Sequence, residues 1–179
     1  MSINIICALA KNKTIGYKGS IPWHIPKDLK YFKKITSGDK NDNALVMGRK
    51  TWQSLPTYPN TLPNRNSYII TNNPPLISRK NITFIEMPST EDIITMKKKH
   101  SNIWICGGQS IYEYFINKPY IDKLYLTELN SDFKGDTYFP EIPSHFHKVI
   151  QGEPYASKLN AISFVNYNFT VYSNLTHPR

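Results

Sequence analysis

The stretch Ile103–Tyr112, IWICGGQSIY, joins an apolar, strand-like run to a pair of glycines and then to the start of a helical pattern. A second stretch, Ala44–Trp52, ALVMGRKTW, repeats this order with one glycine and a basic pair. Short apolar runs bounded by turn residues are typical of buried strands. Strands that alternate with helices predict a largely parallel sheet with right-handed crossovers and helices on both faces.

Eight runs in total have the composition of strands, with turn-forming residues between them. They are Ile3–Ala10, Ala44–Met47, Ser67–Thr71, Ile82–Ile85, Ile103–Cys106, Leu124–Leu129, His147–Ile150 and Ile162–Val171. Helical patterns occur at Lys27–Thr36, Thr51–Ser54, Thr90–Lys99 and Ser110–Ile116. No helical pattern separates the strands after about Asp122, so we expect an antiparallel edge there. The expected fold class is α/β: a central, mainly parallel eight-stranded sheet with an antiparallel C-terminal edge, flanked by about four helices.

The composition is typical of one globular domain, which we expect to span residues 1–179. Of the 179 residues 40% are hydrophobic, and no apolar run approaches the roughly 20 residues of a membrane span. Cys7 and Cys106 lie in strand-like runs without the spacing of a disulfide framework, which favours a cytoplasmic location. The net charge of +9 favours anionic partners. The dense basic run Lys97–His100 is expected to be a solvated helix end.

Asp28 lies on the same predicted helix face as Tyr31, Phe32 and Ile35. An acid in the first turn of a helix can simply complement the helix dipole. The preceding loop, however, contains two glycines, closing prolines and Trp23, a composition that suits a lid over a site that excludes water. We therefore take Asp28 as a candidate catalytic acid.

Arg49, Lys50 and Thr51 directly follow a strand, where ligands bind in parallel α/β sheets. A helix N-terminus with neighbouring basic side chains attracts phosphate. Gly107 and Gly108 occupy the equivalent turn of another strand and allow a ligand to approach the backbone closely. Two such turns predict a ligand with separated phosphates, such as a dinucleotide. No metal-ligand spacing or nucleophilic triad is evident, so we expect no metal and favour cofactor chemistry.

In this order, the residues resemble the dihydrofolate reductase family. The resemblance rests on Ile15-Gly16, Pro22-Trp23, Asp28-Leu29, Phe32-Lys33, Met47–Trp52, Leu62–Arg65, Cys106–Gly108, Tyr112, Gly135–Thr137 and Phe139-Pro140. It implies NADPH-dependent reduction of dihydrofolate to tetrahydrofolate, with hydride transfer to C6 of the pterin and protonation at N5. Water admitted by the loop Gly16–Ile21 would supply the proton.

The resemblance also assigns a substrate site. Asp28, supported by Thr127 and with Trp23 as a further catalytic residue, would pair with N3 and the 2-amino group of the pterin. Arg65, otherwise an ordinary turn residue, would bind the α-carboxylate of the glutamate tail. The remaining substrate-binding residues would be Ile6, Cys7, Leu29, Phe32, Leu55, Leu62, Cys106 and Tyr112.

A cofactor site for NADPH follows from the same resemblance. Its residues would be Ala8, Ile15, Gly16, Ser20, Arg49, Lys50, Thr51, Thr71, Asn72, Gly107, Gly108, Gln109, Ser110 and Ile111. Arg49 would lie nearest to the 2′-phosphate that separates NADPH from NADH.

The chain departs from common family forms at several positions. Asn64 replaces the usual glycine before Arg65, which puts the conformation of that turn in doubt. Gln109 and Ser110 replace residues that in other members are a third Gly or Ser and a phosphate-binding Arg, so phosphate binding would depend more on Arg49 and Lys50. An insertion, Ser37–Asn43, lengthens the loop after the first helix.

Two alternatives remain open at this stage. A riboflavin-pathway NADPH reductase would have a similar fold but would lack the Pro-Trp pair and the helical acid. A basic nucleic-acid binding module would explain the charge but not Asp28, Trp23 or the glycine pair. We expect dihydrofolate and NADPH as partners, a monomer, and no stable nucleic-acid or membrane partner.

Overall fold

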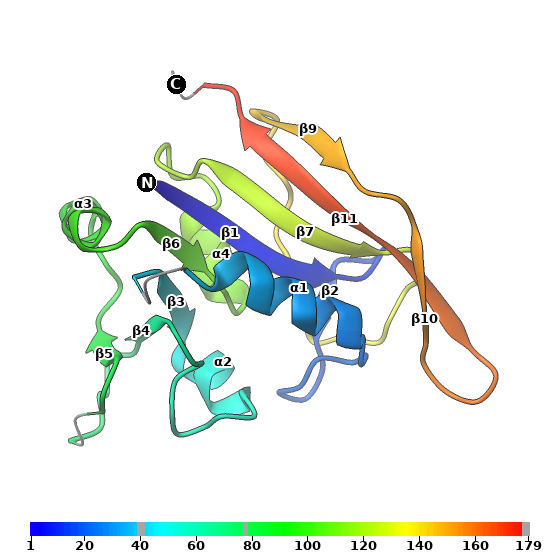
Figure 1. Ribbon diagram of the computed structural model, residues 1–179, viewed down its shortest axis with the longest axis horizontal. Coiled ribbons are helices and arrows are strands. Elements are labelled where there is room, and N and C mark those ends of the chain that lie inside the picture. The colour runs from blue at the N-terminus through cyan, green and yellow to red at the C-terminus, as the bar shows by residue number, and fades with distance from the viewer. Residues whose placement is uncertain (39–41, 77–78, 177–179) are drawn as a thin grey trace.

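The computed structural model describes residues 1–38, 42–76 and 79–176. Within these residues the central sheet has nine strands, in the order β10-β11-β7-β1-β6-β3-β4-β5, with β9 also paired to β11 (Figure 1). The strands are β1 (Ser2–Leu9), β3 (Ala44–Gly48), β4 (Asn66–Ile70), β5 (Ile82–Ile85), β6 (Asn102–Ile105), β7 (Lys123–Leu129), β9 (Phe146–Gln151), β10 (Tyr155–Lys158) and β11 (Phe164–Asn174). All eight expected strands are present, and β10 adds a ninth.

Strand direction follows the expected division. The β5-β4-β3-β6-β1-β7 portion is parallel throughout, whereas β11 runs antiparallel to β7, β9 and β10. A separate two-stranded sheet, β2 (Thr14–Gly16) with β8 (Thr137–Tyr138), was not expected from the sequence. The mainly parallel sheet with an antiparallel C-terminal edge is confirmed.

Helices cover both faces of the sheet. They are α1 (Pro26–Thr36), α2 (Arg49–Ser54), α3 (Thr90–Lys99) and α4 (Gln109–Phe115). Alternate residues of each central strand face opposite sides: Ile5 packs in the cluster that contains α4, while Ile6 packs with Phe32 of α1 and Trp52 of α2. In Figure 1, α1 lies in front of the sheet and α4 behind it. Because helices cover both faces, the strand-to-helix turns are accessible from the carboxyl ends of the strands.

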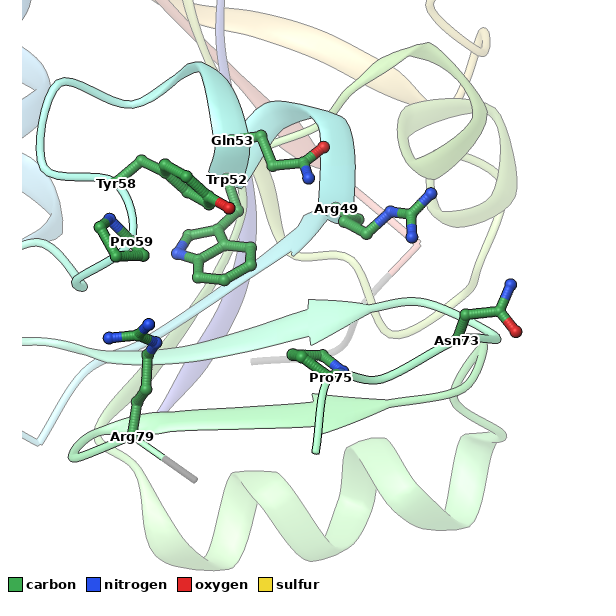
Figure 2. A pocket seen from close by; sticks show the side chains of 8 residues that line it. All are labelled: Arg49, Trp52, Gln53, Tyr58, Pro59, Asn73, Pro75 and Arg79. Carbon is green, nitrogen blue, oxygen red and sulfur yellow. The ribbon is translucent and has the colours of Figure 1, made fainter. Parts of the chain in front are cut away.

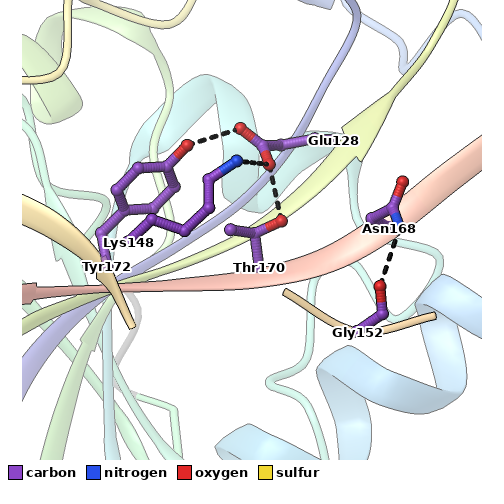
Figure 3. Close-up of polar contacts among 6 residues, drawn as sticks. All are labelled: Glu128, Lys148, Gly152, Asn168, Thr170 and Tyr172. Atoms are coloured by element: carbon purple, nitrogen blue, oxygen red, sulfur yellow. Dashed lines mark hydrogen bonds and ion pairs between the residues drawn. The ribbon is translucent and has the colours of Figure 1, made fainter. Parts of the chain in front are cut away.

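A polar network joins the antiparallel strands (Figure 3). The carboxylate of Glu128 in β7 accepts hydrogen bonds from Thr170 Oγ1 at 2.6 Å and from the Tyr172 hydroxyl at 2.9 Å, both in β11. Lys148 Nζ of β9 lies 3.7 Å from the same carboxylate. Thr170 is fully buried, so its hydroxyl needs such a partner. This network helps to fix the register between the parallel body and the C-terminal strands.

The start of the last strand, the environment of His100 and the turn at Asn64 are defined by the structure. The last strand begins at Phe164 and not at Ile162, which lies in the preceding turn and is 92% exposed. The expectation of a solvated helix end was wrong for His100, which is buried and whose Nε2 lies 2.8 Å from the Tyr68 hydroxyl. Asn64 adopts φ +63°, the left-handed conformation that asparagine tolerates better than most residues, so the turn keeps a glycine-like shape. Part of the insertion, residues 39–41, lies outside the described residues.

Candidate active site

The carboxyl ends of the parallel strands bring distant parts of the chain together. Since β1, β3, β4 and β6 run in the same direction, their carboxyl ends lie side by side. The turns after β3 and β6 are joined directly, because Gly48 N donates to Gly107 O at 2.8 Å. The Tyr112 hydroxyl of α4 donates to Ile6 O of β1 at 2.8 Å. The two phosphate-binding turns predicted from the sequence are therefore neighbours.

Asp28 lies in the first turn of α1, opposite β7. Thr127 Oγ1 donates a hydrogen bond of 2.6 Å to Asp28 Oδ1. Burial raises the pKa of the Asp28 carboxyl above its ordinary value, and the hydrogen bond from Thr127 lowers it in part. Within the described residues, Asp28 Oδ2 has no hydrogen-bond partner, so it is available to a ligand that presents N–H groups.

The loop between β2 and α1 is attached to the segment just before β8. Lys18 N donates to Asp136 Oδ2 at 2.8 Å, and Asp136 N donates to Gly16 O at 3.0 Å. A methyl group at Gly16 would lie 2.5 Å from Thr137 Oγ1, so a side chain there would force this contact apart. Ser20, a predicted cofactor residue, is exposed in this loop, and Ile15 next to Gly16 is half-buried.

Trp23 ends the same loop and is buried. Its ring packs edge-on against Phe133 with centroids 4.9 Å apart, and it shares an apolar cluster with Ile25, the residue that precedes α1. The indole Nε1 has no hydrogen-bond partner in the described part of the chain.

The predicted pocket walls come from both sides of the sheet. Phe32, Leu55, Leu62 and Cys106 pack with Ile6 in one cluster, and Leu29 on α1 leaves 51% of its surface exposed. Cys7 and Tyr112 belong instead to the cluster on the opposite face.

These two residues nevertheless lie within electrostatic reach of Asp28. Burial chiefly raises the pKa of Cys7, to about 12, and the Asp28 carboxylate adds to that shift. The pKa of the Tyr112 hydroxyl is also raised, mainly by burial and in small part by Asp28. Both groups are therefore neutral at physiological pH.

Arg65 closes the far end of the apolar wall. Its side chain is almost completely buried, at 2% exposed, and its guanidinium carbon lies 6.0 Å from the centre of the Phe32 ring. Burial lowers the pKa of Arg65 from its ordinary value. No acidic side chain in the described ranges pairs with it. A buried cation without a protein counter-ion is typical of a site for an anionic ligand.

The glycine pair lies directly before α4 and is packed closely by neighbouring side chains. Gly107 has φ +92°, and a Cβ there would lie 2.6 Å from the Tyr112 ring. A Cβ on Gly108 would lie 3.3 Å from Thr51 Oγ1, so a side chain there would also crowd its neighbour. The Gln109 side chain forms hydrogen bonds within the protein: it accepts one from Tyr138 N and donates one to the Glu113 carboxylate. Ser110 is exposed and Ile111 is buried.

A cavity of about 230 Å³ lies beside Arg49 (Figure 2). It is lined by Arg49, Trp52, Gln53, Tyr58, Pro59, Asn73, Pro75 and Arg79. Figure 2 places Arg49 and Asn73 at one end and Arg79, with Pro59, at the other. Thr71 and Asn72 directly precede Asn73, and Lys50 is exposed next to Arg49. The sequence predicted Arg49 as a cofactor residue but gave no role to Asn73 or Arg79, which stand in a loop without a recognisable pattern.

The described residues contain no helix long and apolar enough to cross a membrane. They also contain no group of three or more His, Cys, Asp or Glu side chains that could hold a metal ion.

Comparison with known proteins gives one consistent result. A family model described as dihydrofolate reductase matches residues 2–173. The dihydrofolate reductase of Buchnera aphidicola is 36% identical over 175 residues, which cover 97% of this chain and 99% of that protein. That of Bacillus subtilis is 34% identical over 151 residues, which cover 84% of this chain and 83% of that protein.

A solved structure agrees with these sequence matches. It is a dihydrofolate reductase from Enterococcus faecalis complexed with NADP(H) and RAB-propyl, which is 30% identical to this chain. The TM-score is 0.78, and the match covers 97% of this chain and 96% of the other. Of the three functions considered from the sequence, the comparisons favour the first.

The raised pKa of Asp28 predicts a pH-dependent cost to stability. Above its folded pKa the carboxyl is charged in both the folded and unfolded states, and burial of the charge lowers the free energy of unfolding. Below the unfolded pKa it is protonated in both states and this cost disappears. Asp28→Asn should therefore be more stable than wild type at pH 7, because the amide carries no charge that burial would penalise.

Urea unfolding across a pH series measures this difference. The advantage of Asp28→Asn should shrink as the pH falls through the folded pKa, and the exposed control Asp132→Asn should show no such trend. A variant that is less stable than wild type at pH 7 would contradict the assignment.

Proposed function

Because the chain belongs to the dihydrofolate reductase family and reduces dihydrofolate to tetrahydrofolate with NADPH, we propose that Asp28 is the residue that binds and polarises the pterin ring. The observation that carries this assignment is the hydrogen bond from Thr127 to one oxygen of a half-buried carboxylate. Thr127 fixes the carboxylate plane and uses one lone pair of Oδ1, so Oδ2 and the other lone pair of Oδ1 are left for the substrate. Asp28 then accepts the two parallel N–H bonds from N3 and the 2-amino group of the pterin.

The proton for N5 reaches the substrate through water. Asp28 holds the pterin while Trp23, whose indole N–H has no partner in the described residues, orders the adjacent water. The Gly16–Ile21 loop controls the access of that water, and its attachment to Asp136 supports a closed position. Bound NADPH supplies the hydride that C6 receives.

The two ends of dihydrofolate are bound by opposite charges. Asp28 takes the pterin, the walls formed by Phe32, Leu55 and Leu62 take the benzoyl ring, and Arg65 takes the α-carboxylate of the glutamate tail. Arg65 suits this role because its planar guanidinium can offer two parallel N–H donors to a carboxylate. Ile6, Cys7, Leu29, Cys106 and Tyr112 complete the pocket.

The residues at the carboxyl ends of the parallel strands fit NADPH. Gly107 and Gly108 lie directly before α4, where the absence of side chains would let a pyrophosphate approach the backbone closely. Arg49, beside the cavity of Figure 2, offers its guanidinium to the 2′-phosphate. The remaining contacts come from Ala8, Ile15, Gly16, Ser20, Lys50, Thr51, Thr71, Asn72, Gln109, Ser110 and Ile111.

We further propose that the chain works as a monomer of one domain in the cytoplasm, without a nucleic-acid partner. Within the described residues, one nine-stranded sheet that includes strands from β1 to β11 supports one domain. The two cysteines are free thiols, which supports a reducing compartment.

Replacing Asp28 tests its catalytic role. Asp28→Asn keeps an acceptor for Thr127 but offers the pterin N–H groups a neutral amide. It should lose about 2 to 4 kcal/mol of transition-state stabilisation, or roughly 30-fold to 1000-fold in kcat/KM for dihydrofolate. The Kd for NADPH should stay unchanged. The assay is NADPH absorbance with and without dihydrofolate, and normal turnover by the variant would rule out this role.

Replacing Arg49 tests cofactor selection. Arg49→Ala should weaken NADPH binding by about 1.5 to 3 kcal/mol, the scale of a charged hydrogen bond, and leave NADH binding nearly unchanged. Arg79→Ala is the matched control, because it removes an equal charge from the other end of the same cavity. Equal losses for both cofactors in Arg49→Ala, or equal effects of the two variants on NADPH, would place Arg49 away from the 2′-phosphate.

A further inference from the structure

The guanidinium of Arg65 is held by two hydrogen bonds from within the protein. Nε donates to Pro63 O at 3.0 Å, and Nη1 donates to Thr36 Oγ1 at 2.8 Å. A guanidinium has five N–H donors, so three have no partner in the described residues. Since Pro63 and Thr36 occupy the other two, the orientation of the remaining donors is determined before any ligand binds.

Thr36 is well suited to fix that orientation. It is the last residue of α1 and has no exposed surface. Its hydroxyl donates to Phe32 O, one helical turn earlier, at 2.8 Å. Because the hydroxyl proton is used in this way, Oγ1 presents only lone pairs to Arg65. The helix thus converts the hydroxyl into a directed acceptor.

The backbone of Thr36 is held as firmly as its side chain. Thr36 O accepts a hydrogen bond from Asn43 Nδ2 at 3.0 Å, and Asn43 Oδ1 accepts one from Asn102 Nδ2 of β6 at 3.2 Å. Asn43 is 2% exposed, so these contacts are shielded from water. The end of α1 is therefore tied to the sheet, and Oγ1 cannot follow Arg65 if the guanidinium turns.

We propose that Thr36 is a positioning residue for substrate binding, which holds Arg65 so that its unpartnered N–H donors face the carboxylate of the glutamate tail. The proposal rests on the role proposed above for Arg65. Thr36 itself does not touch the substrate. It holds the guanidinium beside the Phe32 ring, and the backbone carbonyl of Phe32 in turn orients the Thr36 hydroxyl. Phe32 and Arg65 are thus positioned together.

A residue that only terminates α1 would affect every substrate equally, whereas a positioning residue affects only substrates with a tail. The test compares dihydrofolate with 6-methyl-dihydropterin, which lacks the benzoyl-glutamate tail. Thr36→Val keeps the shape but removes the acceptor. It should raise KM for dihydrofolate about tenfold, the scale of one lost hydrogen bond to a charged group, without changing kcat. KM for 6-methyl-dihydropterin and the Kd for NADPH should stay the same.

Two further variants complete the design. Thr36→Ser keeps the hydroxyl and should restore the KM for dihydrofolate. In an Arg65→Ala background, Thr36→Val should add no further increase in KM, because there is no guanidinium left to orient. If Thr36→Val does not fold, Thr36→Ala takes its place in the same comparison.

The outcomes separate this inference from the role of Arg65. An equal rise in KM for both substrates, or no rise for dihydrofolate, would overturn the proposal for Thr36. If Arg65→Ala alone leaves KM for dihydrofolate unchanged, the role of Arg65 itself is wrong. Three results together would support both roles. Thr36→Val raises KM for dihydrofolate only, Thr36→Ser keeps the wild-type KM, and Thr36→Val has no further effect on KM in the Arg65→Ala background.

Discussion

The hydrogen bond between Thr127 and Asp28 is the constraint on which the site depends. It joins the first turn of α1 to the middle of the sheet and places a carboxylate where burial makes its charge costly. The packing around it keeps the helix start in place: Ile25 is buried beside Trp23, and Tyr31 stacks on Phe169 of β11 with ring centroids 4.1 Å apart. The C-terminal strands, which hold none of the proposed site residues, are therefore needed to support α1.

A single helix connects the two charged ends of the proposed substrate site. Asp28 lies in its first turn, Phe32 one turn later, and Thr36 at its end, where the hydroxyl meets Arg65. These positions recur every four residues and so share a face of the helix. The distance between the acid and the cation is consequently set by the length of α1, while Asn43 and Asn102 prevent its last turn from shifting.

Local sequence patterns were enough to predict most of the sheet and the two strand-to-helix turns, because buried strands and glycine turns have distinct compositions. The short pairs β2–β8 and β10–β11 were harder: Thr14–Gly16, Thr137–Tyr138 and Tyr155–Lys158 lack an apolar run and depend on partners elsewhere. The same reason explains why Asp136 and Thr36 were missed as contacts. Asp136 meets Lys18 across 118 positions, and Thr36 meets Arg65 across 29, so no local pattern reveals either pair. His100 was misjudged because its lysine neighbours are exposed while its ring bonds to Tyr68 inside the protein.

The central claim is that the fold keeps Asp28 in an environment that disfavours its charge and reserves one carboxylate oxygen for the substrate. Carbon-13 NMR of aspartate-labelled protein, with Asp28→Asn to assign the signal, measures the titration of this carboxyl directly. We predict a pKa above the ordinary value of 3.8 in the free enzyme. A carboxyl that titrates at or below that value would contradict the account, because Asp28 would then be solvated or already paired within the protein.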